Sequence, residues 1–169
     1  MKDYIFRKAV IEDKNSIWNI IQQAILRRKA DGSNQWQDGY PNLQTIENDI
    51  AKKIGFVLVD DETIIGYCAA LINDEPEYAK IIGKWLTNDD FVVIHRIAID
   101  ENYLGKGLSG KIIEFVENLA TEQNIFSVKV DTNFDNLAMM KIFERRGYQY
   151  CGEVYFRGSA RRAYEKVLK

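Results

Sequence analysis

The sequence predicts an α/β protein, because segments with strand-like and helix-like hydrophobic patterns alternate along its whole length. Of its 169 residues, 46% are hydrophobic and 28% are charged, which is the composition of a globular protein large enough to bury a core. No linker, internal repeat or low-complexity tract interrupts the alternation. We therefore expect a single domain that spans residues 1–169.

The chain opens with a predicted strand and a long helix. Residues 4–10 alternate enough to form a strand, and the acidic pair Glu12 and Asp13 suits the first turn of a helix. Apolar residues at helical spacing continue this helix to a basic run at residues 27–29. Cations stabilise the C-terminus of a helix, so we expect the helix to end there.

A second helix and a hairpin follow. Residues 43–54 have helical spacing, and Gly55 is expected to end this helix in a left-handed cap. The acidic turn at residues 60–62 separates two apolar runs, which is the pattern of a β-hairpin. Residues 73–90 are irregular, and we expect either a partly ordered insertion near a substrate entrance or a long loop.

The sequence pattern in the last part of the chain predicts a strand, a helix and a final hairpin. Residues 126–131 form the strand, and Asp135 opens a helix that stops at Gly147. The final hairpin turns at residues 157–159.

A glycine-rich turn lies between a β-rich run at residues 94–99 and a helix that begins near residue 108. Glycines let backbone N–H groups approach an anion, and the positive end of the helix dipole favours the same charge. The turn therefore predicts a phosphate site, built on Gly105, Lys106, Gly107, Leu108 and Ser109.

The same turn matches the G-x-G-x-x-G pattern of dinucleotide-binding proteins, with Asp131 about 20 residues further on. In that fingerprint the first glycine directly follows the strand, whereas residues 100–104 intervene here. Too few elements follow Asp131 to complete a doubly wound sheet. These facts disfavour a dinucleotide-dependent oxidoreductase, and a Walker A loop is excluded because no Gly-Lys-Ser or Gly-Lys-Thr sequence is present.

Charge and cysteine content narrow the function classes further. The net charge of −2 disfavours nucleic acid as the main ligand. No apolar run approaches the roughly 20 residues that span a bilayer, and the N-terminus lacks a signal peptide, so we expect a cytoplasmic protein without membrane partners. Cys68 and Cys151 lie in strand-like segments, where we expect buried thiols and no disulfide.

Two motifs resemble the GNAT superfamily of acetyl-CoA-dependent N-acetyltransferases. Residues 97–99 followed by residues 104–109 resemble its acetyl-CoA motif, R/Q-x-x-G-x-G/A. Residues 136–148, in which Asn136 opens a helix that ends in Gly-Tyr, resemble its second signature. The resemblance implies a mixed, mostly antiparallel central sheet of about seven strands, with two splayed parallel strands and four flanking helices.

The cofactor that this resemblance implies is acetyl-CoA, and it implies no metal. The pyrophosphate would lie on the backbone amides of residues 105–109, and the pantetheine arm would pair with the strand that precedes them. The implied cofactor-binding residues are Ile97, Ala98, Ile99, Leu104, Gly105, Lys106, Gly107, Leu108, Ser109, Asn136 and Phe143.

Three positions depart from the family pattern. Leu104 stands where Arg or Gln is usual, so one phosphate-facing side chain is missing, and Ser109 replaces a final Gly or Ala. Phe143 stands where many members carry a Tyr that protonates the departing thiolate, and Phe cannot donate a proton. Either another group or water supplies the proton, or the thiolate leaves unassisted, as a thiol pKa near 8.5 permits.

The candidate general base is His95, the only histidine in the chain. Strand alternation places His95, Ile97 and Ile99 on one face and Arg96 on the other. The position matches a catalytic histidine of the arylalkylamine branch of the family, while the neighbouring base position, Val93, is apolar. A structural histidine hydrogen-bonded under the loops is the alternative. Weaker candidates for the base are Asp131, Glu75 and Glu77.

We expect the protein to move an acetyl group from acetyl-CoA to a primary amine by direct attack in a ternary complex. The aromatic side chains of Trp36, Tyr40 and Trp85 suggest a pocket for a small amine, or they only anchor their loops. A peptide or protein amine is the rival acceptor. The alternative class is a non-catalytic acyl-CoA sensor, which Leu104 and Phe143 favour. Such folds commonly form homodimers, although nothing in this sequence fixes one.

Overall fold

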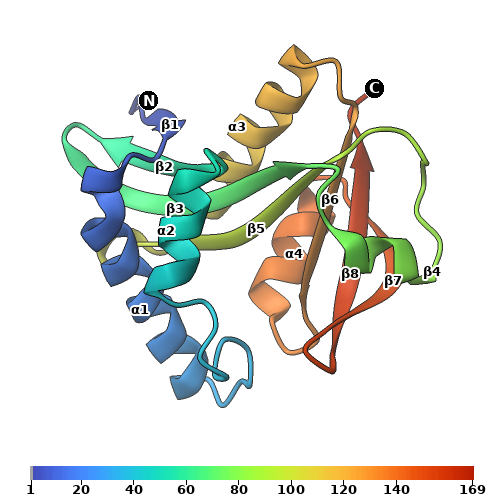
Figure 1. The fold of residues 1–169 in the computed structure, drawn as a ribbon, viewed down its shortest axis with the longest axis horizontal. Helices are drawn as coiled ribbons and strands as arrows, with labels where there is room; N and C mark the ends of the chain where they lie inside the picture. Colours follow the sequence, from blue (N-terminus) through green and yellow to red (C-terminus); the bar gives the residue numbers. More distant parts are fainter. Residues whose placement is uncertain (1) are drawn as a thin grey trace. The chain divides into compact units, whose positions relative to one another are not determined.

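The computed structural model describes residues 2–169 and confirms the α/β class (Figure 1). It divides into two compact units. The first contains the residues up to Ala70 together with Arg96–Phe115, and the second contains Leu71–His95 and Val116–Lys169. Each unit is described in turn, followed by the elements that the two share.

The first unit contains three antiparallel strands of the sheet and two helices. In chain order these elements are β1 (Ile5–Lys8), α1 (Lys14–Ala30), α2 (Leu43–Ala51), β2 (Gly55–Asp60) and β3 (Thr63–Ile72). β1 pairs with β2, and β2 pairs with β3, both antiparallel. Helices α1 and α2 lie side by side (Figure 1). A short 3-10 helix, η1 (Ile11–Asp13), precedes α1.

Apolar spacing explains how α1 packs on the sheet. Ile17, Ile20 and Ile21 recur on one face of the helix and are at most 1% exposed. They form one cluster with Ile46 of α2 and with Val57 of β2. The core of the first unit is therefore built from the apolar faces of both helices and the inward side chains of the sheet.

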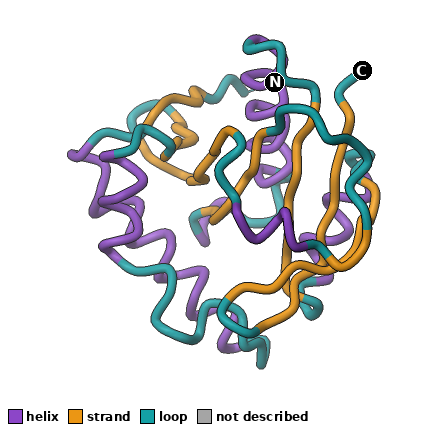
Figure 2. Tube along the Cα trace, turned by 45° about the vertical axis from the view of Figure 1, so that its right-hand side comes forward, coloured by secondary structure: helices purple, strands orange, loops and turns teal. Residues whose placement is uncertain are grey.

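The second unit contains the C-terminal strands and the last helix. In chain order these elements are η2 (Pro76–Lys80), β4 (Ile82–Gly83), β6 (Ser127–Asn133), α4 (Leu137–Arg145), β7 (Gln149–Phe156) and β8 (Ser159–Val167). β8 pairs antiparallel with both β6 and β7, and β7 also pairs with β4. The long strands run side by side in Figure 2. Helix α4 packs on β8, where Phe143 meets Tyr164.

Three elements run through both units, namely β3, whose last two residues belong to the second unit, β5 (Val92–Ile99) and α3 (Leu108–Glu122). β5 and β6 pair in parallel, from Val92 with Val128 to Ile94 with Val130. The strand order in the sheet is β1-β2-β3-β5-β6-β8-β7-β4. This is the mixed, mostly antiparallel sheet that the family resemblance implied. The two-residue β4 adds a strand to the expected number.

The expected left-handed cap at Gly55 was wrong. Helix α2 ends at Ala51, and Lys53 takes the left-handed conformation, with a φ of 60°. The N–H groups of Lys53 and Ile54 donate back to the carbonyls of Ile50 and Asp49, so a lysine forms the cap. Gly55 belongs to β2, and a Cβ there would lie 3.0 Å from the Tyr67 hydroxyl, so this glycine provides space.

Residues 73–90 are partly ordered, as one of the two expectations stated, because they include η2 and β4. A buried carboxylate holds the end of this segment. Glu165 of β8 accepts hydrogen bonds from the Leu86 amide at 2.6 Å, the Thr87 hydroxyl at 2.5 Å and the Ser127 hydroxyl at 2.7 Å. A fully buried carboxylate requires such donors, so the segment and β8 stabilise each other.

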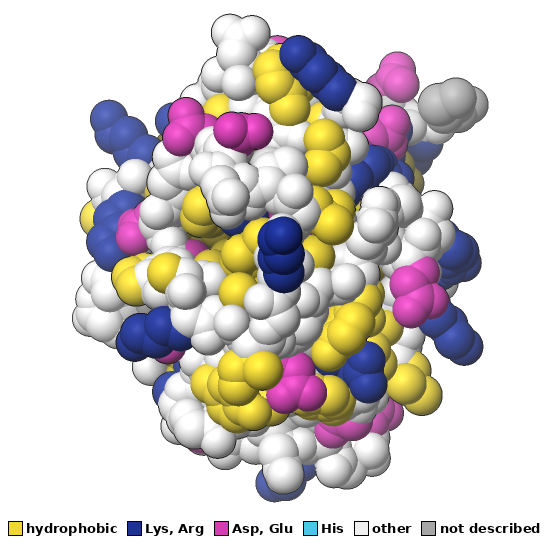
Figure 3. Space-filling view, turned by 90° about the vertical axis from the view of Figure 1, so that its right-hand side faces the viewer, with side chains coloured by type: hydrophobic (Ala, Val, Ile, Leu, Met, Phe, Trp, Pro, Cys, Tyr) yellow, Lys and Arg dark blue, Asp and Glu magenta, His cyan; other side chains and the backbone are white. Residues whose placement is uncertain are grey.

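Surface properties agree with the charge balance of the sequence. On the face drawn in Figure 3, basic and acidic side chains are interspersed with apolar ones, and no continuous basic surface is visible there. Within residues 2–169, no helix has both the length and the apolar character needed to cross a bilayer.

Candidate functional site

The glycine turn precedes α3 in the first unit. Gly105 and Gly107 have φ values of 76° and 73°, which residues with a side chain rarely adopt. A Cβ at either position would meet no atom within 4 Å, so open space lies beside both residues. Glycine is required at both positions because of the positive φ. The turn also leaves room for a ligand to approach the main chain at the N-terminus of α3.

The side chains of the turn add one cation and one exposed apolar group. Lys106 is exposed, and its Nζ lies 4.7 Å from the centre of the Tyr103 ring. Leu104 is 46% exposed, whereas Leu108 is buried and anchors the first turn of α3. Ser109 is half-buried. These groups fit an anionic ligand that is held mainly by backbone amides, with Lys106 as the nearby positive charge.

The strand before the turn is interrupted at Arg96, whose φ is 57°. The expectation that His95, Ile97 and Ile99 share one face assumed an uninterrupted pleat, and a left-handed residue breaks that pleat. That expectation stays a prediction, because strict alternation cannot be assumed through Arg96. The β5–β6 register ends at Ile94, before the interruption.

The second unit places His95 between two carboxylates. His95 Nε2 lies 2.7 Å from Glu75 Oε2, and its Nδ1 lies 3.8 Å from Asp131 Oδ2. The Tyr78 hydroxyl donates to Asp131 Oδ2 at 2.6 Å. The side chains are 18% exposed for His95, 13% for Glu75 and 9% for Asp131. The cluster is thus mostly enclosed but retains some access to solvent.

Burial sets the protonation behaviour of this cluster. It raises the pKa of Asp131, and the neighbouring His95 opposes that shift. Burial together with the Asp131 charge raises the pKa of Tyr78 well above its ordinary value, so Tyr78 stays protonated and donates. The two ring nitrogens of His95 thus lie near two carboxyl groups, one of which also accepts a hydrogen bond from Tyr78.

Of the two acidic candidates in residues 73–90, only Glu75 reaches the histidine. It stands at the N-terminus of η2, where buried Tyr78 fixes the segment. Glu77 instead pairs with Lys80 at 3.4 Å on the surface. Spacing alone did not separate these two residues, because the irregular segment gives no periodicity from which to derive an orientation.

The aromatic candidates have contacts within their own units. The Trp85 indole donates to the Tyr78 carbonyl at 2.8 Å, and Lys129 Nζ lies 4.6 Å from its ring centre. Trp36, with a φ of 61°, packs against the core of the first unit. The Tyr40 hydroxyl accepts from Arg96 Nη1 at 2.5 Å. All three residues stay predictions as substrate contacts.

The two candidates from the second motif lie at the start and in the interior of α4. Asn136 is its N-cap, and its Oδ1 accepts from the Met139 amide at 3.2 Å. Phe143 is 2% exposed and packs against the rings of Tyr148 and Tyr164. An apolar ring at this position therefore has a clear packing role in the second unit.

Sequence reasoning missed a buried ionic network in the first unit. Arg96 donates through Nε and Nη2 to the two carboxylate oxygens of Asp49, at 2.9 and 2.6 Å. The Tyr67 hydroxyl donates to the same carboxylate at 2.5 Å. The only signal in the sequence was an arginine within an apolar strand, and nothing there indicated its partner.

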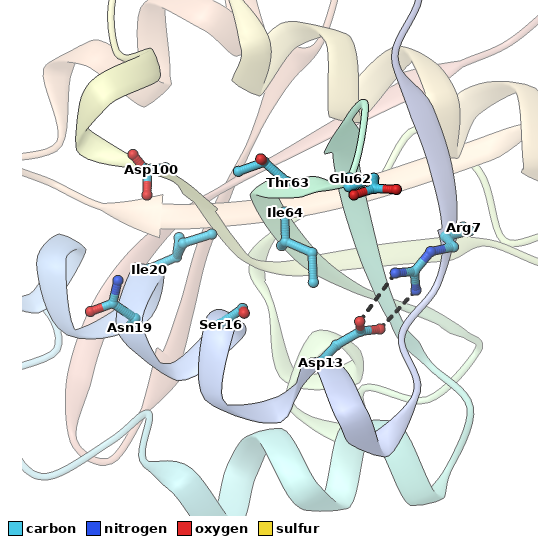
Figure 4. A pocket seen from close by; sticks show the side chains of 9 residues that line it. All are labelled: Arg7, Asp13, Ser16, Asn19, Ile20, Glu62, Thr63, Ile64 and Asp100. Carbon is cyan, nitrogen blue, oxygen red and sulfur yellow. Dashed lines mark hydrogen bonds and ion pairs between the residues drawn. The ribbon is translucent and has the colours of Figure 1, made fainter.

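A polar pocket of about 490 Å³ in the first unit contains none of the predicted site residues. Figure 4 shows Arg7 paired with Asp13 at one end and Asp100 at the other. Its lining residues are Arg7, Asp13, Ser16, Asn19, Ile20, Glu62, Thr63, Ile64 and Asp100. Nowhere in residues 2–169 do three or more His, Cys, Asp or Glu side chains form a metal-binding group.

Comparison with known proteins gives one consistent result. The family model described as the acetyltransferase (GNAT) family matches residues 18–148. YesJ, an uncharacterized N-acetyltransferase of Bacillus subtilis, is 23% identical over 146 residues, which are 85% of this chain and 81% of YesJ.

Solved structures agree. The crystal structure of a GNAT-family acetyltransferase from Streptococcus agalactiae is 33% identical, with a TM-score of 0.89 over 98% of this chain and 96% of that chain. The acetyltransferase YncA of Salmonella typhimurium, solved with its cofactor acetyl-CoA, shares the fold at 14% identity. Its TM-score is 0.69, over 98% of this chain and 94% of that chain.

Lys129 yields a prediction about pH. It is 4% exposed and lies over the rings of Trp85 and Phe91, and burial lowers its pKa below the ordinary value of 10.5. Between the folded and unfolded pKa values the unfolded chain binds more protons, so this group makes the free energy of unfolding rise with pH. Lys129→Met removes this contribution of Lys129 to the pH dependence of the free energy of unfolding.

The stability advantage of Lys129→Met over the wild type should therefore be largest near neutral pH and shrink toward pH 10.5. Urea unfolding of both proteins across this interval measures the difference. Lys141→Met, at an exposed position of α4, controls for the loss of a lysine as such. A stability advantage of Lys129→Met that grows with pH would contradict a lowered pKa of Lys129.

Proposed function

Because the chain belongs to the GNAT family of acetyltransferases, we propose that it transfers an acetyl group from acetyl-CoA to a small primary amine. The observation that carries this proposal is the placement of His95 between Glu75 and Asp131. Such a cluster suits the removal of a proton from an amine. The glycine turn before α3 supplies the matching cofactor site.

The turn fits the pyrophosphate of acetyl-CoA. Two left-handed glycines, the open space beside them and the N-terminus of a long helix suit an anion held by main-chain donors. Lys106 would add a positive charge, and Leu104 none. When bound, acetyl-CoA supplies an acetyl group activated as a thioester. We assign the pantetheine arm to the backbone of Ile97 and Ile99, because the β5–β6 register ends before these residues.

His95 is the proposed general base. In this proposal the ring proton lies on Nε2, which donates to the Glu75 carboxylate, and the lone pair lies on Nδ1. An amine must lose its proton to attack, because an ammonium ion has no lone pair. After His95 takes that proton, Glu75 and Asp131 flank the imidazolium. Tyr78 keeps Asp131 oriented through its 2.6 Å hydrogen bond.

The departing thiolate receives no proton from Phe143 in this proposal. The phenyl ring has no donor and is packed in the interior of the second unit. A thiol with a pKa near 8.5 is a good leaving group, so departure without an acid is chemically reasonable. Asn136 remains our candidate for contacting the cofactor arm.

The acceptor we favour is a small amine that arrives as a cation. Two carboxylates beside the base attract an ammonium group and favour its approach. Trp36 and Tyr40 lie in the loop between α1 and α2 and are our candidate acceptor contacts. Trp85 has Lys129 over one ring face, and it supports the His95 cluster through Tyr78.

We expect the purified protein to release coenzyme A from acetyl-CoA when a suitable small primary amine is added. A thiol-reactive dye measures this release across a panel of aliphatic, arylalkyl and polyamine acceptors and lysine peptides. Release with peptides alone would change the acceptor class. Tight acetyl-CoA binding without release for any amine would contradict the enzyme and favour a non-catalytic acyl-CoA sensor.

Replacement of the base should slow the chemistry but leave cofactor binding intact. His95→Ala is expected to lower kcat roughly 10²- to 10⁴-fold, because proton removal loses its acceptor. The Kd for acetyl-CoA, measured by calorimetry, should change little. Glu75→Gln should also lower kcat, whereas Glu77→Gln serves as the matched control at a surface carboxylate. A wild-type pH–rate profile in His95→Ala would contradict the assignment.

Gly107→Ala tests the cofactor turn. An alanine with a φ of 73° is strained by roughly 1–2 kcal/mol, and its methyl group would enter the space assigned to the pyrophosphate. We expect acetyl-CoA affinity to fall about tenfold or more, equivalent to about 1.4 kcal/mol of binding free energy.

Gly158→Ala is the matched control. Gly158 lies in the β7–β8 turn with a φ of 74°, and it too has open space around its Cβ position. Its substitution should lower the free energy of unfolding by a similar amount without weakening cofactor binding. Equal losses of acetyl-CoA affinity in the two variants would argue against a cofactor site at the turn.

A further inference from the structure

Arg96 has a left-handed backbone conformation within a β-strand, with a φ of 57°. Such a conformation is unfavourable for a residue with a side chain, and it persists only where the surrounding structure imposes it. Strained residues of this kind cluster at functional sites. Arg96 directly follows the proposed base, His95, and directly precedes Ile97.

The Arg96 side chain is held by buried polar contacts. The guanidinium donates to both oxygens of Asp49, and Nη1 donates to the Tyr40 hydroxyl. The Arg96 side chain is 9% exposed and the Asp49 side chain 5%, so neither charge can be left without the other. Tyr67 also donates to Asp49. The guanidinium is therefore fixed from both ends.

We propose that Arg96 is a positioning residue for acetyl transfer. Its buried contacts with Asp49 and Tyr40 hold the backbone at residue 96 in the left-handed conformation, and this conformation sets the direction of the chain at His95 and Ile97. Through Tyr40 the same guanidinium ties the loop between α1 and α2 to the strand. This inference rests on the proposed function, because it links the strained conformation at residue 96 to acetyl transfer.

The competing explanation is that Arg96 and Asp49 form only a structural ion pair. The two explanations predict different activities for glycine and alanine at position 96: a positioning role predicts a more active glycine variant, whereas a purely structural ion pair predicts equal activities. Glycine adopts a positive φ freely, whereas alanine does so at a cost. In an ordinary extended strand, by contrast, glycine is the weaker residue. A comparison of the two substitutions therefore isolates the backbone conformation.

The experiment uses Asp49→Asn in both variants, so that no buried carboxylate is left without its partner. The amide that this substitution introduces still offers an oxygen to Tyr67, and the variants D49N/R96G and D49N/R96A then differ by one methyl group. We expect the glycine variant to exceed the alanine variant roughly 5- to 30-fold in kcat/KM. Its affinity for acetyl-CoA, measured by calorimetry, should differ in the same direction.

Lys53 provides the control, because it is an exposed residue with a φ of 60° at the end of α2. Lys53→Gly and Lys53→Ala should differ in melting temperature but agree in kcat/KM and in acetyl-CoA affinity. A difference in activity at this position would show that left-handed strain affects activity wherever it occurs, and would overturn the specific role of Arg96.

The proposal would be overturned if the glycine variant were no better than the alanine variant in both kcat/KM and acetyl-CoA affinity. If the wild type releases no coenzyme A with any amine, the proposed function fails, and the acetyl-CoA affinities alone decide the positioning role. If the double variants do not fold, Arg96→Lys replaces them, since it keeps the charge but loses the two-pronged contact. Wild-type kcat, pH–rate profile and acetyl-CoA affinity in Arg96→Lys would then overturn the proposal.

Discussion

A buried ion pair between Arg96 and Asp49 constrains how the first unit packs. Two charges are tolerated in a protein interior only when they meet with good geometry and when further groups satisfy their remaining hydrogen-bonding capacity. Here the two-pronged contact meets the first requirement, and Tyr67 and Tyr40 help to meet the second. Asp49 lies on α2 and Arg96 on β5, so the pair joins a helix to the strand on which our functional proposals depend.

In the second unit, too, buried polar and charged groups are stabilised by specific partners. His95, Asp131 and Tyr78 satisfy one another in a largely enclosed cluster, and burial raises the pKa of both acidic groups there. Nearby, Glu165 is fully buried and receives several hydrogen bonds, while the ammonium group of Lys129 lies against aromatic faces. Each of these polar groups therefore has a specific partner, and the partners of Glu165 hold the end of the irregular segment in place.

Local features could be predicted because short-range physics determines them. A glycine is required where φ is positive, as at Gly107, and amphipathic spacing identifies a buried helix face. A local rule was wrong at the end of α2. Lys53 forms the cap that was expected of Gly55, and Gly55 instead lies in β2, where it leaves room for the Tyr67 hydroxyl. At Arg96, side-chain contacts with distant residues accompany a left-handed conformation within the strand.

By itself, the sequence determined the order of the elements, the glycine turn before α3 and the membership of the GNAT family, since each depends on residues close together in the chain. Only the tertiary structure decided which distant side chains meet: Glu75 rather than Glu77 with His95, Lys129 with Trp85, and Asp49 with Arg96. These pairings depend on how the strands and helices pack, because a buried charge selects the partner that packing brings within hydrogen-bond distance. No periodicity along the chain records that choice.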